Sequence, residues 1–160
     1  MKTILREAVL NDYMAIASWI TDQHSCTQWA GPLIQYPFSA DVLPQLLAVT
    51  NSESYCLVNG SGKPLGFGQL WFGKQGSIHL MRIIVSPQIR GEGLGRELCR
   101  QLIIRALDGR NTRSITLRVY CDNTDALALY TSLGFSPIDL KSTNEALFME
   151  LIPGDQGPAM

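Results

Sequence analysis

The sequence lacks a cysteine pair at the spacing of a metal or redox site. Its four cysteines include no Cys-x-x-Cys, and its two histidines are not clustered, so neither a zinc site nor a redox dithiol is indicated. Three of the four thiols stand among apolar neighbours, and we expect these to be core residues in a reducing compartment rather than nucleophiles. The cysteines are Cys26, Cys56, Cys99 and Cys121.

The sequence also lacks a long hydrophobic run and an excess of charge of either sign. No stretch approaches the roughly 18 apolar residues of a membrane-spanning helix. Thirteen Lys and Arg face fourteen Asp and Glu, which gives a net charge of −1 and argues against a nucleic-acid partner. The first twelve residues, MKTILREAVLND, show no apolar segment before a cleavage site. We therefore expect a cytoplasmic protein with no membrane or nucleic-acid partner.

Length and composition favour one compact unit. A chain of 160 residues with 46% hydrophobic residues can bury a single core. Only the Pro- and Gly-containing stretch 153–160 is expected to lie outside the packed domain. We expect a single domain over residues 1–152 followed by a loose tail.

Hydrophobic periodicity predicts strands and helices in the order β-α-α-β-β-β-α-β-α-β-β. This order is typical of an α/β fold in which helices cover both faces of a mixed sheet. Residues 27–38, TQWAGPLIQYPF, are expected to form a structured loop. The predicted strands cover 3–7, 55–58, 65–72, 78–85, 115–119, 135–140 and 146–151, and the predicted helices cover 12–20, 39–50, 93–107 and 125–133.

The most informative segment is a glycine-rich turn, IIVSPQIRGEGLGR, at residues 83–96. An apolar strand leads into a Pro-containing turn, and three alternating glycines then open an amphipathic helix. Glycines permit positive φ, and the free N–H groups at the start of a helix bind anions. The turn therefore predicts a phosphate-binding site.

Two common nucleotide motifs do not fit this turn. A GxGxxG motif counted from Gly91 needs a small residue where Arg96 stands, and a P-loop needs a Lys that the turn lacks. The pattern [QR]xxGxG is satisfied twice, from Gln88 and from Arg90. A glycine turn that binds no ligand is the plain alternative.

A second motif lies downstream of the turn. The segment NTDALALYTSLGF at 123–135 matches NxxAxxLYxxxGF. Together, the strand–[QR]xxGxG–helix unit and this segment resemble the GNAT superfamily of acetyl-CoA-dependent N-acetyltransferases. The resemblance covers residues 78–135 and implies the GNAT-like fold.

The resemblance implies an acetyl-CoA site and no metal. The backbone of the preceding strand would pair with the pantetheine arm of the co-substrate, and the turn would hold its pyrophosphate. Asn123 would contact the arm, and it also suits the N-cap of its helix. The residues implied in binding acetyl-CoA are Ile83, Ile84, Val85, Arg90, Gly91, Glu92, Gly93, Leu94, Gly95, Arg96, Asn123 and Tyr130.

The catalytic residues that the resemblance implies are Tyr130 and His79. Tyr130 matches the family tyrosine that protonates the departing CoA thiolate, whereas helical periodicity alone favours a core aromatic there. Many relatives carry a glutamate where His79 stands, and others carry one where Arg118 stands. Arginine cannot act as a base, so His79, with an ordinary pKa near 6.5, is the candidate base. A half-exposed strand residue is the alternative interpretation of His79.

The implied reaction is acetyl transfer to a primary amine of a small molecule or peptide, by a monomer or a homodimer. Aromatic residues predicted to line the acceptor pocket are Trp29, Tyr36, Phe38 and Trp71. A second hypothesis is a regulatory module that binds CoA or acetyl-CoA without turnover. A third is a structural α/β domain with no ligand. Steady release of free CoA in the presence of an amine separates the enzyme from the other two.

Overall fold

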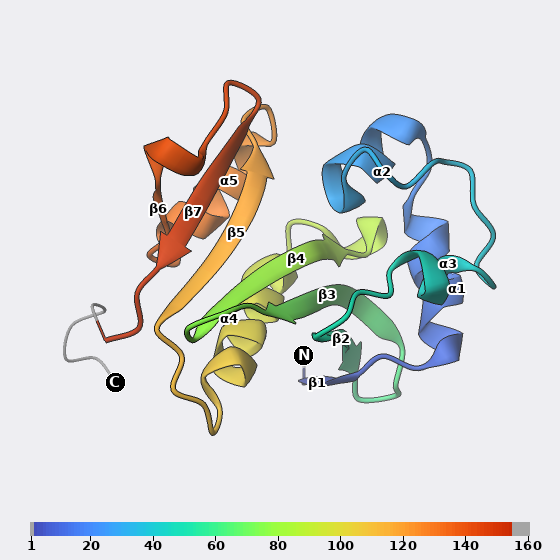
Figure 1. Ribbon diagram of the computed structural model, residues 1–160. Helices are drawn as coiled ribbons and strands as arrows, with labels where there is room; N and C mark the ends of the chain where they lie inside the picture. Colours follow the sequence, from blue (N-terminus) through green and yellow to red (C-terminus); the bar gives the residue numbers. More distant parts are fainter. Residues whose placement is uncertain (1, 155–160) are drawn as a thin grey trace.

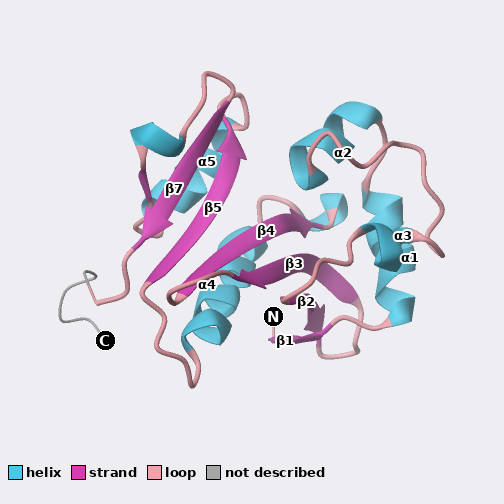
Figure 2. Cartoon of the chain, in the orientation of Figure 1, coloured by secondary structure: helices cyan, strands magenta, loops and turns pink. Residues whose placement is uncertain are grey.

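The computed structural model describes residues 2–154, which form one seven-stranded sheet with helices on both faces (Figures 1 and 2). The strand order is β1-β2-β3-β4-β5-β7-β6, and only the β4–β5 pair is parallel. The strands are β1 (Thr3–Glu7), β2 (Ser52–Asn59), β3 (Pro64–Phe72), β4 (Ser77–Val85), β5 (Ser114–Tyr120), β6 (Ser136–Pro137) and β7 (Ala146–Leu151). The mixed α/β sheet expected from the sequence is confirmed.

The helices follow the predicted order with one addition. They are α1 (Leu10–Trp19), α2 (Gln23–Ala30), α3 (Leu43–Leu46), α4 (Leu94–Leu107) and α5 (Thr124–Ser132), with two short 3₁₀ turns at Pro87–Ile89 and Asp139–Lys141. The predicted strand over 135–140 contracts to the two residues of β6 followed by the second 3₁₀ turn. Pro153 and Gly154 form a turn, and the remainder of the expected tail lies outside the described residues.

The largest hydrophobic core lies between the sheet and α4. The apolar stripe of α4, in which every fourth residue is apolar, is buried over its whole length, from Leu94 through Leu98 and Leu102 to Ala106. The helix approaches β3 closely, because a Cβ at Gly68 would stand only 2.6 Å from Leu102 Cδ1. This glycine therefore allows α4 to lie directly against the sheet, behind β3 and β4 in Figure 1.

A second core lies on the opposite face, under α1 and α2. Phe67 of β3 and Ile84 of β4 pack in this core, whereas Ile83 and Val85, on either side of Ile84, pack against the core that contains α4. Ile16 of α1 is fully buried here, and the ring of Trp29 meets Phe67 edge-on at 6.2 Å. The alternation of β3 and β4 side chains thus joins the two faces into one domain.

The region between α1 and β2 corrects the sequence-based prediction. Residues 27–30, expected in a loop, belong to α2, which begins at a cap where Asp22 Oδ1 accepts a hydrogen bond of 2.8 Å from Ser25 N. The helix expected over 39–50 shrinks to α3. Pro44 in its first turn removes an N–H donor, and no side chain caps its start.

The described residues also give a finding about membranes. Among them, no helix combines the length and the apolar character that crossing a bilayer requires.

Candidate active site

The central feature of the site is a split in the sheet between β4 and β5. The two strands pair over only three positions, from Ser77 with Ser114 to His79 with Thr116. Beyond His79 they diverge, and Figure 1 shows the resulting V, with α2 on one side of its open end and α5 on the other. Among residues 2–154, no strand therefore neighbours the edge of β4 from Leu80 to Val85 on this side.

A bulge in β4 accompanies the split. Gln69 pairs with Met81 and Phe67 pairs with Ile84, so Gly68 alone faces two residues, Arg82 and Ile83. Bulges bend a strand and increase its local twist, which explains why β4 turns away from β5 here. Arg82 has φ of +54°, an unusual value for a residue with a side chain.

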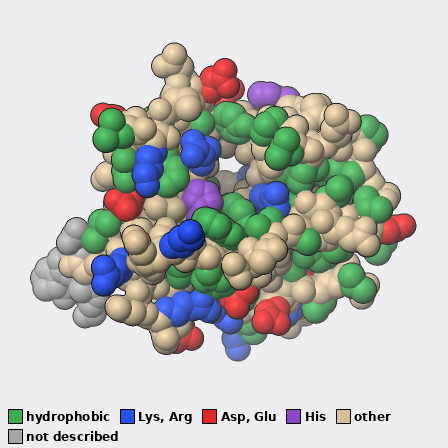
Figure 3. Space-filling model, in the orientation of Figure 1, with side chains coloured by type: hydrophobic (Ala, Val, Ile, Leu, Met, Phe, Trp, Pro, Cys, Tyr) green, Lys and Arg blue, Asp and Glu red, His purple; other side chains and the backbone are tan. Residues whose placement is uncertain are grey.

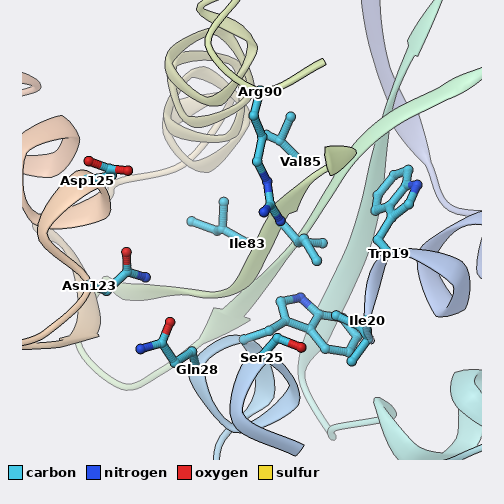
Figure 4. A pocket seen from close by; sticks show the side chains of 11 residues that line it. Trp19, Ile20, Ser25, Gln28, Ile83, Val85, Arg90, Asn123 and Asp125 are labelled. Carbon is cyan, nitrogen blue, oxygen red and sulfur yellow. The ribbon is translucent and has the colours of Figure 1, made fainter. Parts of the chain in front are cut away.

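Three cavities of about 300, 90 and 430 Å³ lie along the split. Ile83 lines all three, and the backbone and side chains of the β4 edge form a shared wall. Figure 4 shows the first of them, with Arg90 extending into it from the glycine turn and with Gln28 and Asn123 side by side below. Five residues that line this cavity, all labelled in Figure 4, were not predicted from the sequence as site residues: Trp19, Ile20, Ser25, Gln28 and Asp125.

The glycine turn ends at the largest of the cavities. Gly91 and Gly93 have φ of +87° and +78°, and nothing lies within 4 Å of a Cβ built on either, so their backbone conformation explains the glycines. Gly93 is the N-cap of α4, and no side chain in the described part of the chain caps the helix. The first N–H groups of α4 are therefore available to an anion at the cavity.

The predicted turn residues do not all face the cavity. The residues that line it include Arg90, Gly91, Gly93, Leu94, Gly95 and Arg96, together with Ile83, Ile84 and Val85 of β4. Glu92 is exposed and is absent from this lining. Arg96 also ties α4 to α5, because its Nη1 donates a 2.7 Å hydrogen bond to Ser132 Oγ.

Asn123 occupies the other wall, at the end of β5. Its Oδ1 accepts a hydrogen bond of 3.4 Å from Ala126 N, so it is the N-cap of α5, one of the two roles predicted for it. The residue also lines two of the cavities. The preceding residue, Asp122, accepts a hydrogen bond of 3.1 Å from Gln28 Nε2, which joins α2 to this loop across the open end of the split.

Tyr130 of α5 lies inside the split. Its ring is buried against Phe135 in an edge-on contact at 6.2 Å, and the residue lines two cavities. The Tyr130 hydroxyl has no hydrogen-bond partner among residues 2–154. Every fully enclosed side-chain oxygen in these residues has a partner, so the hydroxyl is not fully enclosed, in keeping with its place beside the cavities. Burial raises the pKa of Tyr130, and the phenol therefore keeps its proton at neutral pH.

His79 lies at the closed end of the split and lines none of the three cavities. Its Nδ1 is 2.8 Å from Thr116 Oγ1, and its ring stacks on Phe148 at 6.0 Å. Burial and, secondarily, the charge of Arg118 lower the pKa of His79 to about 4, so the ordinary value of 6.5 expected from the sequence is wrong. The ring is neutral at pH 7 and is a weaker base than expected.

The predicted acceptor residues separate in space. Trp29 lines two cavities from α2, and its Nε1 donates a 2.8 Å hydrogen bond to the carbonyl oxygen of Arg82. Tyr36 and Phe38 pack on the core under α1, with ring centroids 6.1 Å apart, away from these cavities. Trp71 lies on β3 opposite His79, with 40% of its surface exposed.

Within residues 2–154, this site contains neither a buried thiolate nor a cluster of metal-binding side chains. Burial raises the pKa of Cys99 to about 12, so this cysteine is protonated. Within the described part of the chain, no cluster of three His, Cys, Asp or Glu side chains suits a metal ion.

Comparison with known proteins identifies the scaffold. Residues 14–135 match the model of the Acetyltransferase (GNAT) family. A mycothiol acetyltransferase of Rothia mucilaginosa is 43% identical over an alignment of 81 residues that covers 45% of this chain and 21% of that protein. The [ribosomal protein bS18]-alanine N-acetyltransferase of Escherichia coli K12 is 39% identical over 62 residues, 39% of this chain and 41% of that protein. The chain thus spans less than half the length of either relative.

A solved structure has the same fold over the whole domain. The spermidine N-acetyltransferase of Vibrio cholerae, crystallised with CoA and spermine, superposes with a TM-score of 0.76 and 19% identity, over 94% of this chain and 95% of that one. At this identity the likeness concerns the fold. The arrangement of strands and helices predicted from the two sequence motifs is confirmed.

Proposed function

This chain belongs to the GNAT acetyltransferase family, and we propose that it transfers the acetyl group of acetyl-CoA to a primary amine. The observation that carries the proposal is that the uncapped start of α4 and Tyr130 open onto one cavity of about 430 Å³. The start of α4 suits a phosphate, and Tyr130 brings a protonated phenol to the same cavity. This pairing supports a phosphorylated acyl donor whose leaving group needs a proton.

The residues present fit acetyl-CoA. Free N–H groups from Gly91 to Arg96 would bind its pyrophosphate, with Arg90 and Arg96 near as cations. The unpaired edge of β4 from Leu80 to Val85 offers backbone groups to an extended chain, as in strand addition. Acetyl-CoA supplies the activated acetyl group as a thioester.

Transfer forms a C–N bond and breaks the C–S bond of the thioester. In our proposal Tyr130 donates a proton to the departing CoA thiolate. The attacking amine loses a proton as it becomes an amide nitrogen, so a base must accept that proton. His79 is the candidate acceptor for that proton, because its ring is neutral at pH 7. Since His79 does not line the cavities, a water molecule would have to relay the proton to it.

Thermal unfolding with and without acetyl-CoA tests the binding half of this proposal. At 100 times its dissociation constant, a ligand that binds only the folded state adds about 2.7 kcal/mol to the free energy of unfolding. For a domain of this size the midpoint should rise by roughly 5–10 °C. An unchanged unfolding midpoint at saturating acetyl-CoA would contradict both the donor site and the proposed activity.

A further inference from the structure

Arg82 is a partly buried cation without a carboxylate partner among the described residues. Its Nη1 donates hydrogen bonds of 3.0 Å to Leu47 O and 3.0 Å to Gln69 Oε1, both uncharged acceptors. The ion pairs found in residues 2–154 join other side chains. A partly desolvated charge that no carboxylate balances costs stability, so the protein gains from an anion that binds beside it.

The backbone of Arg82 is also under strain. It has a positive φ at the β4 bulge, and the Trp29 indole holds its carbonyl oxygen. Non-glycine residues in this conformation cost of order 1–3 kcal/mol and cluster at binding and catalytic sites. The surrounding hydrogen bonds therefore fix both the backbone and the guanidinium of Arg82 in one position.

A second arginine lies across the split. Arg118 of β5 and Arg82 of β4 both line the cavity of about 90 Å³, which they share with Tyr130 and Asn123. The guanidinium of Arg118 lies over the ring of Phe148 at 5.2 Å and has no ion-pair partner in the described part of the chain. None of the residues that line this cavity is Asp or Glu.

Basic side chains also flank the opening of the split. On the face drawn in Figure 3, Lys and Arg side chains lie on both sides of the central hollow, and acidic side chains lie farther out. Two acidic residues lie by the split, but neither lines the cavity of about 90 Å³. Asp122 accepts a hydrogen bond from Gln28, and Asp125 lines the other two cavities.

We propose that Arg82 and Arg118 select an acceptor amine that carries a carboxylate. The inference rests on the proposed acetyl transfer and names the class of its acceptor. The two arginines are separate from the phosphate end of the site, since neither lines the cavity at the glycine turn. A polyamine would meet two like charges there, so this chain should differ in acceptor from the spermidine N-acetyltransferase whose fold it shares.

A panel of matched amines tests the acceptor class. Glycine, β-alanine and 4-aminobutyrate would each be compared with methylamine, ethylamine and propylamine, their counterparts without the carboxylate, and with spermidine. We expect a kcat/KM at least tenfold higher for one carboxylate-bearing amine than for its counterpart. The chain length that reacts best measures the separation between the bound carboxylate and the reacting nitrogen. Comparing the acetylation of peptide amides that begin Ala-Asp and Ala-Asn tests whether the carboxylate can come from the side chain of a peptide acceptor.

Variants of Arg82 test the residue itself. A hydrogen bond to a charged group contributes about 1.5–3 kcal/mol, so Arg82→Gln should raise KM for the carboxylate-bearing amine by roughly 10- to 150-fold. Arg82→Lys should retain part of the preference. Lys63→Gln is the matched control, because it removes one charge from an exposed residue that lines none of the three cavities. Arg118→Gln gives an independent variant should Arg82 prove necessary for folding.

Binding gives a readout that does not depend on turnover. Titration calorimetry with the preferred amino acid, in the presence of CoA, should show binding to the wild type and loss of it in Arg82→Gln, with CoA affinity unchanged. Weaker CoA binding in Arg82→Gln would assign the arginine to the donor and overturn the inference. Equal or faster acetylation of spermidine would also overturn it, while leaving the proposed transferase activity intact. Release of CoA with no amine at all would contradict the proposed activity instead.

Discussion

The indole Nε1 of Trp29 donates a hydrogen bond of 2.8 Å to the backbone carbonyl oxygen of Arg82. This bond joins α2 to the bulge of β4, across 53 residues of sequence. It holds the residue at which the strand turns away from β5, and so it stabilises the shape of the split.

Replacing Trp29 by Phe should weaken this link while keeping an aromatic ring. We expect the free energy of unfolding to fall by about 1–3 kcal/mol, because a partly buried carbonyl loses its donor. Urea unfolding measures the change. Trp71→Phe is the control, since Trp71 is exposed and should shift stability by less than about 0.5 kcal/mol. Equal effects of the two substitutions would show that the bond to Arg82 contributes nothing specific.

Replacing Tyr130 by Phe separates chemistry from binding. The hydroxyl has no protein partner within residues 2–154, so the folded state should lose no stability and acetyl-CoA should bind as before. Transfer should slow by about 10²–10⁴-fold, the range usual for acid–base groups. Unchanged turnover in the variant would remove Tyr130 from the mechanism.

His79 should make stability depend on pH. Its folded pKa of about 4 lies below its ordinary 6.5, so between these values the unfolded chain binds more protons. Stability should therefore fall by up to about 3 kcal/mol as the pH drops from 6.5 to 4. His79→Gln, which cannot titrate, should flatten that part of the curve measured by urea unfolding at several pH values. The same steep fall in the variant would contradict the lowered pKa.

The same residue gives a kinetic prediction. If His79 takes the amine's proton, the acidic limb of the pH–rate profile should be missing in His79→Gln. An unaltered limb would place the base elsewhere and leave the wild-type histidine as a structural partner of Thr116.

Two glycines with matching geometry test the donor site. Gly93 begins α4 with φ of +78°, and Gly109 follows its end with φ of +65°, and neither would place a Cβ within 4 Å of another atom. Each Gly→Ala change should cost about 1–2 kcal/mol of stability through backbone strain. Only Gly93→Ala should also weaken acetyl-CoA binding, by tenfold or more in a titration. Equal affinities in the two variants would place the donor away from the turn.

The sequence was most informative where local chemistry decides the structure. The stripe from Leu94 to Ala106 predicted α4, and the alternating glycines predicted the open helix start, because both depend on residues near one another. The cap of α5 at Asn123 was predicted for the same reason. These features also contain the motifs that revealed the family.

Three features were missed, one of them local and two that depend on contacts across the fold. The start of α2 rests on a capping pair, Asp22 and Ser25, that precedes the segment 27–38, whose Pro, Gly and aromatic residues indicated a loop. The bulge at Arg82 arises from pairing with β3, which no pattern in β4 reveals. The lowered pKa of His79 arises from burial and from Arg118, 39 positions away in the chain. The cap of α2 is a local signal that the prediction overlooked, whereas strand pairing, burial and charge across the fold set the other two features.

The most direct test of the central claim is release of free CoA from acetyl-CoA by the purified chain, followed with a thiol reagent while amines are added one at a time. We predict release that continues over many turnovers, requires an amine, produces the N-acetylated amine in equal amount, and falls with Tyr130→Phe. Saturable acetyl-CoA binding with no amine-dependent release across cationic, neutral and carboxylate-bearing amines would contradict the account and favour a module that binds the co-substrate without turnover.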